Sequence, residues 1–309
     1  MAAPLIDKPG FYFDVDEKEY HADPVKTPSL SSTVARIMYD ETPKHARYAH
    51  PRLRPPAPGE VEKNDRPMDI GTAVHRRILG RGRTIDVLPF DDYKKNDAKA
   101  MRADSYAVGN VPILQSDMAR VDGLVAGTAE SLKELGRADI FTNCHTEVMM
   151  VWQEKNGVWC RALLDALPMD YETTAHLKLP ELKSTDGSAD VDVFSGRVFG
   201  QGYDVQTAFY RRGLRALLPK MHSVAFEWVI MEQNAPWAVN ILTSSNQIDE
   251  EADTIARIAI DQWGVCMKNG EWPGYAGGEM VETTTWRSMK REARNRWLLE
   301  RMKDWQAPL

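Results

Sequence analysis

The stretch that decides the fold spans residues 158–185 and reads VWCRALLDALPMDYETTAHLKLPELKST. The two ends of this stretch are mostly apolar, and the polar segment MDYETT between them is typical of a turn. The pattern predicts two strands joined by a turn. The preceding segment HTEVMMVWQE, residues 145–154, has the same strand character and is followed by a second turn signal, KNG. Three consecutive antiparallel strands are therefore expected.

Each of the last two strands carries a carboxylate inside an apolar pattern, Asp165 in WCRALLDAL and Glu181 in LKLPEL. Residues two apart on a strand face the same side, so Lys183 is expected beside Glu181, and a hairpin could bring Asp165 next to both. A buried carboxylate costs free energy unless it is paired or binds a cation. Two hard oxygen ligands on rigid strands suit Mg²⁺ or Mn²⁺. The alternative is coincidence, because an Asp followed later by ExK occurs by chance in many proteins.

Four further residues are candidates, and each also has a purely structural interpretation. His75 lies on the apolar face of a helix expected over 68–80 and is either a core histidine or a metal ligand. Glu147 begins the first strand and faces either the same cleft or solvent. Gln206 and Tyr210 are four residues apart and share one helical face. They are either an exposed amide beside a partly buried tyrosine or a hydrogen-bonding pair aimed at a phosphate or at the strand lysine.

The remaining patterns complete the outline of an α/β or α+β chain with a mixed central sheet flanked by helices. They predict helices within 28–40, 116–135, 198–218, 248–268 and 284–305, and strands within 222–233 and 237–245. Ten of the 18 prolines fall in the first 67 residues, which predicts a mostly irregular segment there with one short helix. The expected parts are a proline-rich segment packed on the core, the core itself and a basic C-terminal helix, over 1–67, 68–280 and 281–309.

Composition limits the class of protein. A chain of 309 residues with a net charge of −6 and 43% hydrophobic residues is typical of globular proteins, and it argues mildly against an overall basic surface for nucleic acid. Two short segments are nevertheless rich in basic residues, the one around Arg211 and the last helix expected from the sequence. Three cysteines without a CxxC pair suit a reducing compartment and argue against a four-thiolate cluster. No run of 18 apolar residues and no signal-peptide layout is present, so a cytoplasmic protein without membrane contact is expected.

Five motifs together resemble the PD-(D/E)XK nuclease superfamily in its RecB-like branch, and within that branch the chain is most similar to the RecE-type exonuclease VIII proteins of phages and prophages. In chain order the motifs are GTAVH, TEVMMVW, GVWCRALLD, ELKST and DVQTAFY. The likeness spans about residues 20–275 and leaves the last thirty or so residues unmatched. It departs from the RecE-type pattern at Glu181, where relatives often have Asp, and at Leu163, where they tend to have a polar or basic side chain.

The resemblance implies which residues would hold a metal ion and which would act beside it. The implied ligands of Mg²⁺ or Mn²⁺ are His75, Asp165 and Glu181, assisted by the carbonyl of Leu182. The catalytic residues implied are Lys183 and Glu147, the latter to place the attacking water or a second metal, and the residues next to the substrate are Gln206, Tyr210 and Arg211.

The activity that the resemblance implies is phosphodiester hydrolysis by a Mg²⁺-dependent, ATP-independent exodeoxyribonuclease. Such an enzyme would degrade linear double-stranded DNA from a 5′ end and leave a 3′ single strand for recombination by a RecT-type annealing protein. A ring-shaped homo-oligomer is implied by analogy. A structure-selective endonuclease, or a nuclease acting on RNA, has the same motifs, because a metal site recognises phosphate rather than sugar. A non-catalytic DNA-binding or scaffold protein is the alternative from another class.

Overall fold

The computed structural model describes residues 5–13, 15–55, 66–275 and 296. The chain divides into two compact units, residues 1–272 and 273–309, and every helix and strand named below belongs to the first. The basic helix expected over 284–305, within the expected part 281–309, lies outside the described residues apart from Arg296. The bounds expected for the three parts of the chain stay a prediction. In the described ranges, no helix combines the length and the apolar character needed to cross a lipid bilayer.

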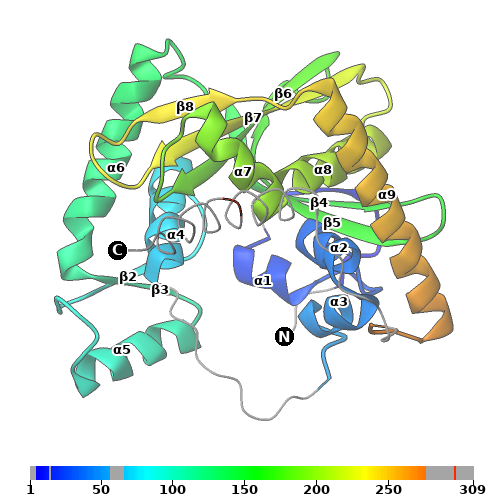
Figure 1. Cartoon of the computed structure of the whole chain (residues 1–309), viewed down its shortest axis with the longest axis horizontal. Coiled ribbons are helices and arrows are strands. Elements are labelled where there is room, and N and C mark those ends of the chain that lie inside the picture. The colour runs from blue at the N-terminus through cyan, green and yellow to red at the C-terminus, as the bar shows by residue number, and fades with distance from the viewer. Residues whose placement is uncertain (1–4, 14, 56–65, 276–295, 297–309) are drawn as a thin grey trace, which may run out of the picture. The chain divides into compact units, whose positions relative to one another are not determined.

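Helices and strands are intermixed along the first unit, which has the mixed α/β fold that the sequence predicts (Figure 1). In chain order they are β1 (Gly10–Tyr12), α1 (Glu17–Ala22), α2 (Ser32–Asp40), α3 (Pro43–Ala49), α4 (Arg66–Leu79), β2 (Ile85–Leu88), α5 (Asn96–Ala107), β3 (Val111–Leu114), α6 (Gln115–Glu134), β4 (Cys144–Gln153), β5 (Trp159–Pro168), β6 (His176–Thr185), α7 (Val191–Gln201), α8 (Tyr203–Leu217), β7 (Ser223–Glu232), β8 (Val239–Leu242) and α9 (Asn246–Asn269). Of these, the sequence patterns did not indicate β1, α1, α3, β2, α5 and β3.

The strands of the described residues form three hydrogen-bonded groups rather than one continuous sheet. β4 pairs antiparallel with β1 on one side and with β5 on the other. β6 pairs parallel with β7, which pairs antiparallel with β8, so this group is mixed, as expected of the central sheet. β2 and β3 form a separate parallel pair.

The sequence predicts that β6 pairs antiparallel with β5, and this prediction is wrong. β6 lies beside β5, but no ladder of main-chain hydrogen bonds joins the two strands in the described part of the chain. Pro180 in β6 has no backbone N–H to donate. The N–H of Leu182 donates instead to Oδ2 of Asp165, at 2.7 Å. A side-chain carboxylate therefore takes the place of a main-chain acceptor where β5 and β6 meet.

The first 67 residues are more regular than their prolines suggest. They contain β1, α1, α2 and α3 rather than one short helix. The one helix that was expected is confirmed as α2, which begins after Ser31, whose side chain caps it. The positions of the prolines make them compatible with these helices. Pro43, for example, is the first residue of α3, where it has no intrahelical hydrogen bond to lose.

The segment before α2 is fixed to β5. The Leu30 N–H donates to the Trp159 carbonyl, and the Arg161 N–H donates to the Leu30 carbonyl, both at 2.8 Å. Asp23 has a fully buried side chain that accepts from the Ser29 hydroxyl at 2.6 Å and pairs with Arg161 at 3.3 Å. These contacts hold the start of α2 in a defined position relative to the strand.

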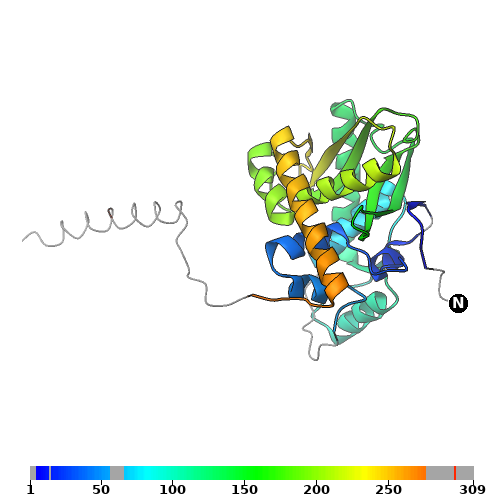
Figure 2. The ribbon, with the colours of Figure 1, turned by 90° about the vertical axis from the view of Figure 1, so that its right-hand side faces the viewer.

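The helices pack around the strands through apolar faces. α4 buries Val74 and Leu79 in a core shared with α6 and β3, and Figure 2 shows α9 lying across α2, α3 and α8. The single helix expected over 198–218 is two helices, because Gly202, with a φ of 70°, ends α7 and caps α8. A side chain at this position would be strained, and its Cβ would meet the side chain of Arg36.

Candidate active site

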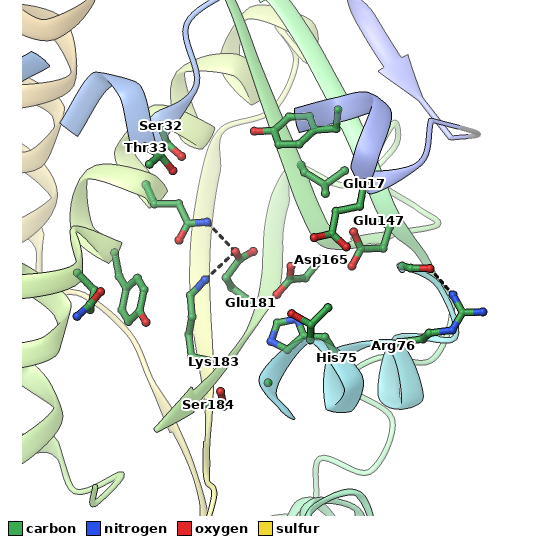
Figure 3. Close-up of a pocket in the computed structure, with 18 of the residues that line it drawn as sticks. Glu17, Ser32, Thr33, His75, Arg76, Glu147, Asp165, Glu181, Lys183 and Ser184 are labelled. Carbon is green, nitrogen blue, oxygen red and sulfur yellow. Dashed lines mark hydrogen bonds and ion pairs between the residues drawn. The ribbon is translucent and has the colours of Figure 1, made fainter. Parts of the chain in front are cut away.

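One cavity collects the polar residues that the motifs single out. It has a volume of about 690 Å³ and is lined by residues of α1, α2, α4, β4, β5, β6, α7 and α8. Seven of the eight site residues expected from the sequence line it: His75, Glu147, Asp165, Glu181, Lys183, Gln206 and Tyr210. Figure 3 shows side chains from β4, β5 and β6 turned toward one another, with the imidazole of α4 among them.

Glu181 is the most enclosed of the three strand carboxylates, with 2% of the residue exposed. Its Oε1 accepts hydrogen bonds from Nζ of Lys183 and from Nε2 of Gln206, both at 3.0 Å. Nε2 of Gln206 also donates to the hydroxyl of Tyr210, at 2.9 Å. The structure thus brings together the pairs expected from strand and helix periodicity and joins them through Glu181.

Burial raises the pKa of Asp165 and of Glu181, and the charge of Asp165 raises the pKa of Glu181 further. For Lys183, burial opposes the charged form, but the two carboxylates outweigh it and raise the pKa. The same ammonium lies 4.8 Å from the centre of the Tyr203 ring. Lys183 is therefore held in its charged form between the two carboxylates.

His75 enters the cavity from α4 as a neutral base. Burial, and then the charge of Lys183, lowers its pKa to about 4. A hydrogen bond with the backbone of Leu182 raises the pKa of His75, as expected when the ring N–H donates to the carbonyl. One ring nitrogen therefore carries the proton and the other keeps its lone pair, the state in which an imidazole binds metal ions.

Glu147 occupies an irregular position in β4. Its φ of 53° lies in the left-handed region, which residues other than glycine rarely adopt. Its two neighbours in β4 pair with β5, so Glu147 stands opposite Asp165 without pairing with it. Burial, followed by the charges of Asp165, Glu17 and Glu181, raises the pKa of Glu147 to about 8.

Glu17 is a cavity residue that the sequence did not indicate. It is the first residue of α1, and Figure 3 shows its carboxylate close to that of Glu147. Burial opposes its ionisation, but contacts with His21 and nearby cations outweigh burial and lower its pKa. No sequence signal marks it, because glutamate is common in the first turn of exposed helices, where it favours the helix dipole.

Arg211, expected as a substrate contact, lies away from the cavity. It is 2% exposed, and its guanidinium pairs with Asp249 at 2.7 Å and with Asp253 at 3.4 Å, both in α9. The next arginine, Arg212, donates to both carboxylate oxygens of Glu154, at 3.0 and 2.8 Å. These two arginines hold α8 to its neighbours, and the partners that engage them could not be read from the motif itself.

The donor set fits the hard divalent cation expected from the sequence. Among the residues that the structure describes, no three His, Cys, Asp or Glu side chains stand as a ready-made metal-binding group. Asp165 and Glu181 are instead engaged by hydrogen bonds from the main chain and from neighbouring side chains. However, a neutral imidazole beside crowded carboxylates with raised pKa values is the arrangement that a divalent cation relieves. His75, Asp165 and Glu181 therefore suit a metal ion by their chemistry.

Comparisons with known proteins bear on the fold. No family model matches the chain, and no curated protein does. The crystal structure of a protein from Eubacterium rectale, described as a proposed exonuclease, matches 88% of this chain and 94% of its own with a TM-score of 0.53. The two chains share a fold. Their sequence identity is 12%, so the likeness concerns the fold alone, and it agrees with the nuclease-like mixed α/β architecture expected from the sequence.

Proposed function

We propose that this protein is a metal-dependent nuclease, and specifically an ATP-independent 5′-to-3′ exodeoxyribonuclease that uses Mg²⁺ or Mn²⁺ on linear double-stranded DNA. The observation that carries the proposal is the position of the Lys183 ammonium, 3.0 Å from Glu181 in the cavity that also holds Asp165 and His75. The motif resemblance and the fold shared with a proposed exonuclease support it.

His75, Asp165 and Glu181 are the residues that would hold the divalent cation. Such a cation, when bound, neutralises charge on a phosphate and lowers the pKa of a coordinated water. The two carboxylates stand on neighbouring strands and the imidazole on a buried helix face, so the protein supplies donors on rigid elements. Glu147 lies on β4 opposite Asp165 of β5, and it would help to place the attacking water.

Lys183, Gln206 and Tyr210 act on the other side of Glu181. The Lys183 ammonium places a positive charge where the phosphate would lie, and it stabilises the negative charge that develops during hydrolysis. Glu181 holds this ammonium, Gln206 holds Glu181, and Tyr210 accepts the second N–H of Gln206. The chain of hydrogen bonds keeps the lysine in one orientation.

The cavity has room and charge for a nucleotide. A volume of about 690 Å³ lies within the range of small-molecule sites, and Arg76, Arg81 and Arg197 line it together with the carboxylates. The motif resemblance alone supports the finer parts of the proposal. These are the 5′-to-3′ direction, the 3′ tail for a RecT-type annealing partner in recombination, a homo-oligomeric ring and a cytoplasmic location.

The test uses purified protein with Mg²⁺ or Mn²⁺, an end-labelled linear duplex and a covalently closed circle. We expect the linear DNA to be degraded from its 5′ end and the circle to remain intact. Lys183→Ala should slow hydrolysis by about a hundredfold or more. Lys178→Ala, which removes an exposed lysine from the same strand, is the matched control and should retain full activity.

Three other outcomes would overturn parts of the proposal. Cutting of the closed circle would indicate an endonuclease. Degradation from the 3′ end would reverse the assigned direction. Absence of hydrolysis with either metal, together with binding of the linear duplex, would favour the scaffold protein.

A further inference from the structure

The start of α2 presents an unused hydrogen-bond donor to the cavity. Ser32 and Thr33 are the first two residues of this nine-residue helix, and both line the cavity. Ser32 is only 8% exposed, and its hydroxyl has no hydrogen-bond partner among the described residues. Figure 3 shows both hydroxyls on the side of the helix end that faces the cavity.

The main chain at this helix end adds two more donors. The Ser31 side chain accepts the N–H of Val34, at 3.4 Å, and the N–H of Ala35 donates to the Ser31 carbonyl. In the part of the chain that the structure describes, this leaves the N–H groups of Ser32 and Thr33 without an acceptor. Unpaired N–H groups and the helix dipole together give a helix start a partial positive charge, which attracts anions.

This helix start is held rigidly beside the catalytic strands. Leu30, two residues before Ser32, is hydrogen-bonded to the β5 main chain through both its N–H and its carbonyl. Ser29 is held in turn by the side chains of Asp23 and Arg161. These contacts fix the position of the Ser32 hydroxyl at the wall of the cavity. An acceptor that binds there meets a donor already in place, so little conformational entropy is lost on binding.

Charge on this side of the cavity favours an anion. Figure 3 shows Ser32 and Thr33 on the side of Lys183, while Glu17 and Glu147 lie on the other side. N–H groups and a hydroxyl that donates would satisfy the oxygens of a phosphate.

We propose that the start of α2 binds a phosphate group of the nucleic-acid strand, next to the phosphate that is hydrolysed, through the Ser32 hydroxyl and the N–H groups of Ser32 and Thr33. The identity of the ligand rests on the proposed nuclease function. A terminal 5′ phosphate and an internal phosphodiester offer the same kind of oxygen, and either would hold the strand in register with the catalytic residues.

Two substitutions at equivalent positions of different helices test the proposal. Ser32→Asp and Asn246→Asp each put a carboxylate at the first residue after a serine cap, in α2 and α9 respectively. A carboxylate there is compatible with the helix dipole, but only Ser32 lines the cavity. Ser32→Ala removes the hydroxyl without adding charge, and it decides the question if Ser32→Asp does not fold.

The measurement is the Kd for short duplexes with a 5′ phosphate or a 5′ hydroxyl, by fluorescence anisotropy, with Lys183→Ala present throughout so that the DNA is not consumed. We expect Ser32→Ala to weaken binding about tenfold, since one hydrogen bond to a charged group is lost. Ser32→Asp should weaken it further, and Asn246→Asp should have no effect. A loss confined to the phosphorylated duplex assigns the terminal phosphate, and an equal loss on both assigns an internal one.

Ser32 variants that bind both duplexes as tightly as the Asn246→Asp control would overturn this proposal and leave the nuclease function intact. If the wild-type protein neither cuts nor binds DNA, the proposed function fails, and inorganic phosphate becomes the probe. Phosphate, compared with chloride at equal ionic strength, should then raise the Tm of the wild type and of Asn246→Asp but not of Ser32→Asp. An equal rise in all three, or none in any, would overturn the phosphate site as well.

Discussion

Glu147 stands directly opposite Asp165 where β4 meets β5, and at this position the main-chain pairing of the two strands is interrupted. The φ of 53° at Glu147 is a conformation that costs about 1–3 kcal/mol for residues with a side chain. Two carboxylates also meet here. Burial raises the pKa of both, and the charge of Asp165 raises the pKa of Glu147 further. Both features lower the stability of the metal-free protein, a cost that proteins accept mainly at functional sites.

Replacing Glu147 by glutamine should therefore stabilise the metal-free protein. The amide has nearly the same shape but carries no charge to repel Asp165, so we expect the free energy of unfolding to rise by about 1 kcal/mol at pH 8–9. Urea unfolding in the presence of a chelator measures the change. Glu134→Gln, at an exposed position of α6, should have no effect. A decrease for Glu147→Gln would show that its carboxylate makes a favourable contact.

Metal binding should stabilise the protein through Asp165. A ligand that binds only the folded state adds about 2.7 kcal/mol at a concentration one hundred times its Kd. We expect Mg²⁺ or Mn²⁺ to raise the Tm of the wild type, and a chelator to reverse the rise. Asp165→Asn keeps an oxygen for the Leu182 N–H but loses the charge, and it should abolish most of the metal-dependent rise. An undiminished rise in this variant would exclude Asp165 as a ligand.

The hydrogen bonds of Gln206 should matter to activity more than those of Tyr210. Gln206→Glu would place a carboxylate about 3.0 Å from Glu181 and compete for Lys183, so we expect hydrolysis to slow about tenfold or more. Tyr210→Phe leaves one N–H of Gln206 without its acceptor, which should destabilise the protein by about 1–3 kcal/mol with a smaller effect on rate. Initial rates and thermal unfolding of both variants separate the two effects. The reverse order of rates would contradict the assignment.

Asp23 should make stability fall at acidic pH. Burial opposes its ionisation, but a hydrogen bond from His50 and the charge of Arg161 outweigh burial and hold its pKa below 3.8. Since the folded value is the lower one, the contribution is present above about pH 4 and is lost as the pH falls through the folded pKa. Asp23→Asn should lose about 3 kcal/mol at pH 7. The difference in the free energy of unfolding between this variant and the wild type should shrink toward pH 3.

Urea unfolding at pH 7, 5 and 3 tests this dependence, with Asp97→Asn at an exposed position of α5 as the control. A difference between Asp23→Asn and the wild type that stays the same at all three pH values would mean that the charge of Asp23 is not what stabilises the fold.

Arg211 should contribute to stability and not to DNA binding. Arg211→Ala removes two ion pairs with α9 and should destabilise the protein by about 2–3 kcal/mol. The affinity of the folded protein for DNA should be unchanged. Arg197→Ala is the contrasting variant, because Arg197 lines the cavity and pairs with the exposed Asp186. It should weaken DNA binding with little loss of stability. Thermal unfolding measures the stability of each variant, and fluorescence anisotropy measures its DNA binding. Weaker DNA binding without loss of stability in Arg211→Ala would restore Arg211 as a substrate contact.

Local periodicity by itself determined the parts of the site that lie within one strand or one helix. Glu181 and Lys183 share a strand face, and Gln206 and Tyr210 share a helix face, because the strand repeat of two and the helix repeat of 3.6 are properties of short segments. Their hydrogen bonds are therefore consistent with what the sequence indicates. The helix of His75 and the existence of strands β4, β5 and β6 are confirmed for the same reason, whereas the antiparallel pairing expected between β5 and β6 is wrong.

Only the tertiary structure decided what depends on segments that meet from far apart in the chain. It placed β6 beside β7 as its ladder partner, and it enclosed Arg211 between carboxylates of a helix that begins 35 residues later. It also brought Glu17 and Ser32 from the N-terminal segment into the cavity. Neither residue belongs to a periodic pattern or a motif that marks the site, and each reaches it because hydrogen bonds from distant residues hold its helix in place. Such contacts are set by packing and main-chain pairing across the fold, which no local pattern of residues records.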